Sequence, residues 1–110
     1  MYMTYNSNPV PVAYTPEELE QVITDYLKNV DLEFSFRGLC YYIVQKAIEE
    51  GKVRDEKTTQ YSSRELNLIS SIEVSKCLWR LIWDKKILIA FGENPYVSHY
   101  NGDTCFVLNK

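Results

Sequence analysis

The sequence has a single histidine, and it lacks the short motifs that mark common enzyme sites. HExxH, GxSxG, GxGxxG and GxxxxGK[ST] are absent, which argues against zinc proteases, serine hydrolases, and dinucleotide- or phosphate-binding folds. The histidine, His99, follows Ser98 in a stretch predicted as strand or turn, and no local pattern supplies a Ser/His/Asp arrangement. We therefore expect a protein that is not an enzyme and that uses no cofactor.

Cysteine pairs and long apolar runs are also missing. The three cysteines, Cys40, Cys77 and Cys105, include no CxxC pair, so the sequence supports neither a disulfide framework nor a zinc site. We expect them to be small apolar core residues. No apolar run approaches the roughly 18–20 residues that cross a bilayer, and the N-terminus lacks the pattern of a signal peptide. These absences predict an intracellular, cytoplasmic protein with no membrane or metal partner.

The 110 residues present are 45% apolar and 14% aromatic, which predicts one folded domain rather than a disordered chain. The net charge is −3, unlike the basic average of nucleic-acid binders. The charge is uneven, however. Residues 1–53 carry eight acids and four bases, whereas residues 54–110 carry seven acids and eight bases. The positive charge concentrates at Lys76, Arg80, Lys85 and Lys86.

The first half of the chain predicts an extended arm and two helices. Residues 1–14 contain two prolines and are expected to be an arm that is disordered or packs on a partner chain. Thr15, Pro16 and Glu18 have the pattern of a capping box with proline at the first helical position, and the apolar spacing then predicts a helix over 16–29. Ser35 and Gly51 have the residue types that begin and end a helix, which predicts a second one over 36–50.

Residues 51–61 are charged and polar and predict a loop, with a short strand near Gln60–Tyr61. Two capping boxes follow this loop. Ser62–Glu65 predicts a short helix over 63–68, and Ser70–Glu73 predicts a longer helix over 71–85. The two predicted helices are separated by a tight turn.

The C-terminal part predicts a β-hairpin. The runs 87–91 and 104–108 are apolar and partly β-branched, which favours strands, and Asn101–Gly102 is a turn pair. Residues 96–100 are either a third strand or the flank of a long hairpin tip.

Residues 62–91 resemble the winged helix-turn-helix family of DNA-binding domains. The resemblance rests on the Ser-x-x-Glu-Leu segment, the apolar spacing of Val74, Leu78 and Leu81, and Ile87 at the family's strand opening. Lys85 stands where the family's helix usually ends in glycine. The resemblance covers about residues 36–108 and implies an α+β fold, with a three-helix core and a C-terminal β-hairpin wing.

The resemblance also implies a domain organisation. An arm over 1–14 would precede a single domain over 15–110. Within that domain, 15–30 would be an extra N-terminal helix, 35–50 the first core helix, 62–85 the helix-turn-helix and 87–108 the wing.

The implied reading helix places several polar, cationic and aromatic side chains toward duplex DNA. The residues expected to contact DNA are Arg64, Ser71, Ile72, Ser75, Lys76, Trp79, Arg80, Lys85, Lys86, His99 and Asn101. Each has a structural alternative. Trp79 and Trp83 can pack on the hairpin or on the N-terminal helix, Lys76 and Arg80 can be solvated charges, and His99 can be an exposed turn residue.

The expected function is that of a small DNA-binding transcriptional regulator that acts as a homodimer through the 16–29 helix or the Trp face. A winged helix without a ligand domain is typical of viral and mobile-element regulators, so that origin is expected by analogy. The alternative is a protein-interaction module that binds a host or partner protein through the same surface.

Overall fold

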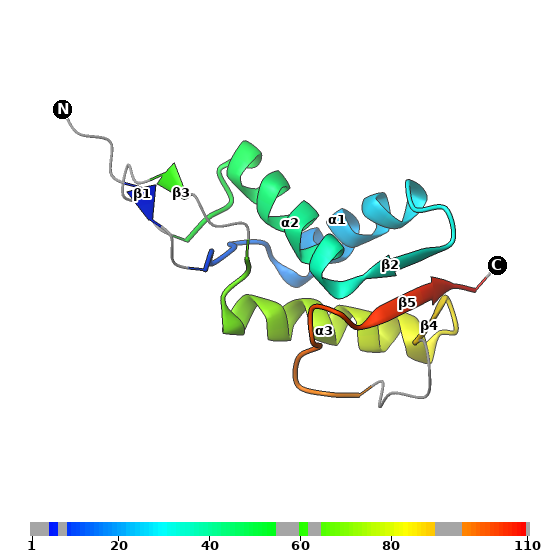
Figure 1. Ribbon diagram of the computed structural model, residues 1–110. Coiled ribbons are helices and arrows are strands. Elements are labelled where there is room, and N and C mark those ends of the chain that lie inside the picture. Colours follow the sequence, from blue (N-terminus) through cyan, green and yellow to red (C-terminus); the bar gives the residue numbers. More distant parts are fainter. Residues whose placement is uncertain (1–4, 7–8, 55–59, 62–64, 90–95, 110) are drawn as a thin grey trace.

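The computed structural model describes residues 5–6, 9–54, 60–61, 65–89 and 96–109. Within them the chain forms an α+β fold (Figure 1). The helices are α1 (Pro16–Lys28), α2 (Phe36–Glu50) and α3 (Leu68–Trp83). An antiparallel sheet has the strand order β2 (Glu33–Ser35), β5 (Cys105–Leu108), β4 (Ile87–Ile89), and a small parallel pair joins β1 (Tyr5–Asn6) to β3 (Gln60–Tyr61). The short strand predicted at 60–61 is therefore confirmed.

The ends of α1 follow from local sequence. The Thr15 side chain accepts a hydrogen bond from the Glu18 backbone N–H at 3.2 Å, and the Glu18 carboxylate accepts one from the Thr15 N–H at 3.0 Å. This reciprocal pair satisfies two backbone donors at the helix start, with Pro16 where no donor is needed. The Thr15 N–H and the nearby Lys52 ammonium lower the pKa of Glu18. The predicted helix over 16–29 is confirmed, one residue shorter.

The predicted helix over 36–50 is also confirmed. The Ser35 hydroxyl accepts a hydrogen bond from the Gly38 N–H at 3.0 Å and caps the first turn of α2. Gly51 ends the helix at φ +70°, a left-handed conformation that glycine adopts without steric cost.

Two predictions about the third helix are wrong. Residues 65–67 are not helical, because Leu66 lies in a bridge with Val10 of the N-terminal segment, so the short helix predicted over 63–68 does not form there. Residues 63 and 64 of that predicted helix lie outside the described residues. In its place α3 begins at Leu68, and Asn67 caps it by accepting the Ser70 N–H at 2.9 Å.

The predicted capping box at Ser70–Glu73 is consequently not formed, and the predicted boundaries 71–85 shift to 68–83. Ser70 lies inside the helix, buried, and its hydroxyl accepts a hydrogen bond from the Val12 N–H at 3.2 Å. The Ser70 hydroxyl, which the local pattern assigned to a helix cap, therefore makes a tertiary hydrogen bond with Val12.

The predicted hairpin is present. β4 and β5 pair antiparallel with Leu88 opposite Val107, and the Asn101–Thr104 turn closes with a 3.0 Å backbone hydrogen bond. Residues 96–100 are not a strand, which favours the hairpin-flank alternative, and residues 90–91 of the predicted first strand lie outside the described part. The third strand of the sheet is β2, which the sequence did not predict; its Phe34 lies opposite Phe106.

The N-terminal segment packs on its own chain. Val10, Val12 and Tyr14 are buried, and Val12 lies in an isolated bridge with Val53. The Tyr14 hydroxyl donates a 2.6 Å hydrogen bond to the Glu50 carboxylate, and burial together with that bond raises the pKa of the phenol. The described part of the arm is therefore a component of the core.

The core lies where the inner faces of the three helices meet the sheet. Side chains with no exposed surface come from every layer, among them Ile23 on α1, Ile43 on α2, Leu78 on α3 and Phe106 on β5. The helix α1 contacts both α2 and α3, so it is one of three core helices. Cys40 on α2 is buried, as expected, and its burial raises the pKa of the thiol to about 12.

Candidate nucleic-acid interface

The outward face of α3 has a row of three exposed residues. Ile69, Lys76 and Trp83 are seven residues apart, which is close to two helical turns, so they align along the helix. All three are exposed, Ile69 at 67% and Trp83 at 76%. Arg80 lies one turn beyond Lys76, and Lys85 and Lys86 follow the end of the helix, all exposed. We call these six residues the α3 outer face.

The cations of this face are unevenly paired. Arg80 Nη1 lies 3.3 Å from a Glu20 carboxylate oxygen of α1, with both side chains about half exposed. Lys76, Lys85 and Lys86 make no ion pair with any residue that the structure describes. Exposed ion pairs contribute little to stability, so these four cations are free to meet an anionic surface.

Lys85 ends α3 in an unusual conformation. Its φ is +60°, in the left-handed region, and it is the one non-glycine residue with positive φ in the described part of the chain. The resemblance placed glycine at this position. Lys85 therefore adopts the left-handed conformation that glycine favours at a helix end. This conformation lies between α3 and β4, and the Lys85 side chain is exposed.

Ser75 was expected to contact DNA, and the structure contradicts that prediction. It has no exposed surface, since its hydroxyl donates to the Ser71 carbonyl at 2.8 Å and accepts from the Tyr100 N–H at 3.3 Å. The hydroxyl instead ties the segment before β5 to α3. Ser71 and Ile72 are half-buried, flanking the outer face without lying at its centre.

Trp79 is half-buried and packs against the core, which favours the structural alternative for this side chain. Its indole Nε1 is buried and has no hydrogen-bond partner among the described residues. Trp83 does not pack in the same way, because three quarters of its surface is exposed.

The remaining residues expected to contact DNA are His99 and Asn101 of the wing, and Arg64. His99 and Asn101 are exposed, as a DNA contact requires. The Asn101 side chain accepts the Asp103 N–H at 3.0 Å, so it also shapes the turn. His99 Nδ1 lies 3.4 Å from the Ser98 hydroxyl. Arg64 lies outside the described residues.

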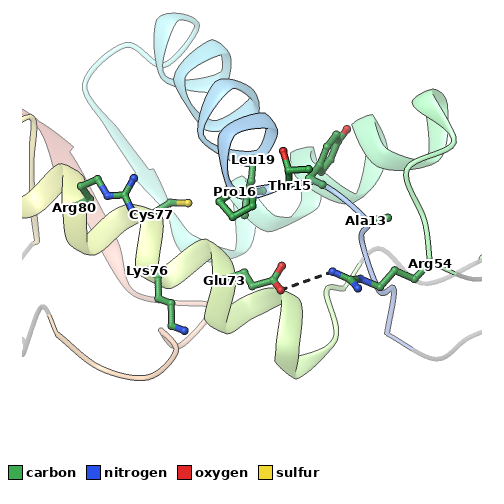
Figure 2. Close-up of a pocket in the computed structure, with 10 residues that line it drawn as sticks. Ala13, Thr15, Pro16, Leu19, Arg54, Glu73, Lys76, Cys77 and Arg80 are labelled. Carbon is green, nitrogen blue, oxygen red and sulfur yellow. Dashed lines mark ion pairs between the residues drawn. The ribbon is translucent and has the colours of Figure 1, made fainter.

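A pocket of about 550 Å³ lies beside the α3 outer face, between α3 and the segment that enters α1 (Figure 2). Sequence reasoning missed it, together with Arg54, because the pocket unites segments that are far apart in the chain. Its lining residues are Ala13, Tyr14, Thr15, Pro16, Leu19, Arg54, Glu73, Lys76, Cys77 and Arg80.

Glu73 and Arg54 face each other across one side of this pocket. An Arg54 terminal nitrogen lies 3.9 Å from the Glu73 carboxylate, and Arg54 Nε donates to the Val12 carbonyl at 3.0 Å (Figure 2). No local pattern could have found this pair, because Arg54 comes from the charged loop before β3. Glu73 therefore acts as an ion-pair partner, in place of the capping role that the sequence predicted.

In the part of the chain that the structure describes, no helix is long and apolar enough to cross a membrane. No group of three or more histidine, cysteine, aspartate or glutamate side chains in that part could hold a metal ion. Comparisons with protein-family models, curated proteins and solved structures give no significant match to this chain.

Proposed function

We propose that this chain is a winged-helix protein that binds duplex DNA through the α3 outer face, as a transcriptional regulator without catalytic activity. One observation carries the proposal: three lysines without an ion-pair partner among the described residues, Lys76, Lys85 and Lys86, lie on the outward face and end of the last helix before the β-hairpin. In helix-turn-helix proteins that helix enters the major groove.

The order of elements supports this assignment. Three helices are followed by the antiparallel pair of β4 and β5, as a three-helix core with a wing requires. In this proposal α1 is the first core helix, because its apolar face is buried between α2 and α3. The reading helix is α3, and the wing is the segment between β4 and β5, which holds His99 and Asn101.

The charge distribution supports phosphate contacts. Lysine ammonium groups neutralise phosphates and release counterions, so each contact makes the affinity fall with salt. If the four cations of the α3 outer face each neutralise one phosphate, the slope of log K against log salt is about −3.6. Affinity then falls roughly 150-fold between about 50 and about 200 mM salt.

A second candidate is a protein-interaction module, and the apolar part of the same surface favours it. Leu68, Ile69 and Trp83 are 60%, 67% and 76% exposed at the two ends of α3. Large exposed apolar side chains that share one face are typical of protein contacts. A partner would cover them, whereas DNA gains most from the lysines between and after them.

A salt-dependent fluorescence anisotropy titration tests the proposal. Random duplex DNA and promoter DNA from the protein's own locus would be titrated at the two salt concentrations. The double variant Lys76→Ala/Arg80→Ala should reduce affinity at least tenfold and make the slope shallower by about 1.8. The control Lys28→Ala/Lys46→Ala removes the same charge from α1 and α2 and should leave both values unchanged.

Three outcomes are informative. Salt-sensitive binding that depends on Lys76 and Arg80 and favours promoter DNA supports a regulator. Equal effects of the two double variants would mean that only overall charge matters, which overturns the assignment of α3 as reading helix. No binding at low salt, together with capture of a protein partner that depends on Trp83, favours the interaction module.

The dimer also belongs to this proposal. The apolar residues of α1 are buried in the chain's own core, so α1 offers a polar outer surface. Trp83 is the more suitable contact for a second copy, and a two-fold arrangement through it would require a roughly palindromic DNA site. Sedimentation of the native protein and of Trp83→Ala tests this directly, since only the native protein should dimerise.

A further inference from the structure

The pocket beside α3 has two chemically different parts. Its floor is apolar: Leu19 is almost fully buried, and Ala13 and Cys77 are half-buried beside it (Figure 2). Burial raises the pKa of the Cys77 thiol, so this side chain is neutral at ordinary pH and adds to the apolar surface. The volume of about 550 Å³ is within the range of sites that hold drug-sized molecules.

The mouth of the pocket is positively charged. Arg54, Lys76 and Arg80 are exposed and line it together with a single carboxylate, that of Glu73. The lining therefore carries a net charge of +2, in a chain whose overall net charge is −3. A concave site with charge of one sign at its mouth raises the local concentration of ions of the opposite sign.

The existing ion pairs leave these cations available. The Arg54–Glu73 separation is 3.9 Å and the Arg80–Glu20 separation is 3.3 Å, and all four side chains are more than one third exposed. Pairs of this kind contribute little free energy, so an incoming anion can share or replace the carboxylate partner. Lys76 has no ion-pair partner among the described residues and needs none to be displaced.

We propose that this pocket binds an amphipathic organic anion, with an apolar body on Leu19, Ala13 and Cys77 and one carboxylate or phosphate group held by Lys76 and Arg80 on the α3 side of the mouth. The apolar body fits the floor, and the anionic group stays at the exposed mouth, where it keeps part of its hydration. The site needs no DNA and holds whether or not the chain binds DNA. Where both bind, they share Lys76 and Arg80, so ligand and DNA compete.

The test uses the fluorescent amphipathic anion 1-anilinonaphthalene-8-sulfonate as probe, with the full chain in its native state. Octanoate and octyl phosphate are the two competitors that combine an apolar body with an anionic group. Octanol lacks the anionic group, and inorganic phosphate lacks the apolar body. We expect octanoate or octyl phosphate to displace the probe at concentrations at least tenfold lower than octanol or phosphate. Whichever of the two is stronger identifies the anionic group.

The variant Ala13→Leu fills the floor without changing any charge, and it should weaken probe binding at least tenfold. Arg80→Ala should weaken it severalfold, and Lys46→Ala, on α2 away from the pocket, should have no effect. Near-ultraviolet circular dichroism of each variant must match that of the native protein. Should Ala13→Leu fail to fold, chemical-shift changes at Leu19 and Cys77 on adding octanoate to the native protein locate the ligand.

Two results would overturn the proposal. Octanol competing as well as octanoate would show an apolar surface without anion selectivity. Unchanged binding in folded Ala13→Leu, or octanoate shifts at Ile69 and Trp83 without shifts at Leu19 and Cys77, would place the ligand outside the pocket. Because Ala13→Leu keeps every cation of α3, DNA binding in this variant should persist, so a failure of the pocket is distinguishable from a failure of the proposed function.

Discussion

The helices α1 and α3 cover the same core with similar inner faces, but their outer faces differ. On α1 most of the outward charges are partnered: Glu18 with Lys52, Glu20 with Arg80, and Asp25 with both Gln21 and Lys28. The exposed Glu17 makes no ion pair with any residue that the structure describes. On α3 the outer face combines Ile69 and Trp83 with Lys76, which has no ion-pair partner among the described residues.

Most of the charges on the outer face of α1 therefore have partners within the chain, whereas the outer face of α3 has exposed groups that a partner could contact. Paired exposed charges gain somewhat less from a new contact, because a partner must first share or replace an existing interaction, even a weak one. An unpaired lysine beside exposed apolar side chains loses nothing of that kind. The α3 outer face is therefore the better place to look for a ligand of macromolecular size.

The largest expected effect tests whether the inner faces are equivalent. Ile23→Ala on α1 and Leu78→Ala on α3 each remove a fully buried side chain, and each should lower the free energy of unfolding by about 2–5 kcal/mol. Urea denaturation measures this. Trp83→Ala, at an exposed site, should stay within about 0.5 kcal/mol of the native protein. A small loss for Ile23→Ala would mean that α1 is not a core helix.

A second test concerns α2, which packs on α1, and it uses pH. The Cys40 thiol has a pKa of about 12 in the folded protein and an ordinary value of 9.0. As pH rises above 9 the unfolded state ionises first, so the contribution of the buried neutral thiol to stability is lost. From pH 7 to pH 10 this loss is on the order of 1 kcal/mol.

The measurement is urea denaturation at both pH values. Cys40→Ala should show a loss smaller by that amount, whereas Cys105→Ala, which leaves Cys40 in place, should keep it. If the Cys40→Ala protein loses as much stability as the native one between pH 7 and pH 10, the thiol does not lie in a dry core.

Substitutions of the residues that cap the starts of α1 and α3 should have a smaller effect on stability. Thr15→Ala and Asn67→Ala each remove a side chain that caps a first turn, and each should cost about 1 kcal/mol. Ser71→Ala replaces a serine inside α3 and should cost almost nothing, since alanine favours helix. Thermal unfolding followed by circular dichroism checks all three. No loss for Asn67→Ala would contradict a start of α3 at Leu68.

Substitutions at the C-terminal ends of α3 and α1 should give the smallest effect, and the one at α3 should increase stability. Lys85→Gly should raise the free energy of unfolding by roughly 0.5–1 kcal/mol, because glycine takes φ +60° without steric cost. Asn29→Gly, at the end of α1, should give no gain because Asn29 has φ −101°. Equal effects in the two variants, measured as denaturation midpoints, would contradict a left-handed Lys85.

Local patterns in the sequence were sufficient where neighbours in the chain supply the contacts. The Thr15–Glu18 capping box, Pro16, the Ser35 cap and Gly51 act within three or four residues, so both N-terminal helices were predicted almost to the residue. The sequence also placed Lys76 and Arg80 away from the apolar face of their helix, and both are exposed. Exposure of a cation depends mainly on the helical period, which the apolar spacing reveals.

The tertiary structure decided what distant segments do to one another. Ser70 and Ser75 have side chains typical of caps and polar surfaces, yet Val12 and Tyr100 turn them into buried tertiary contacts. Glu73 likewise has its partner, Arg54, 19 positions away along the printed chain. The sequence by itself determined the helices and the sign of their exposed charge, because those follow from local hydrogen bonds and period. Only the packed chain decided the start of α3, the third strand and the pocket, because each joins groups whose spacing in the sequence carries no information about their distance in space.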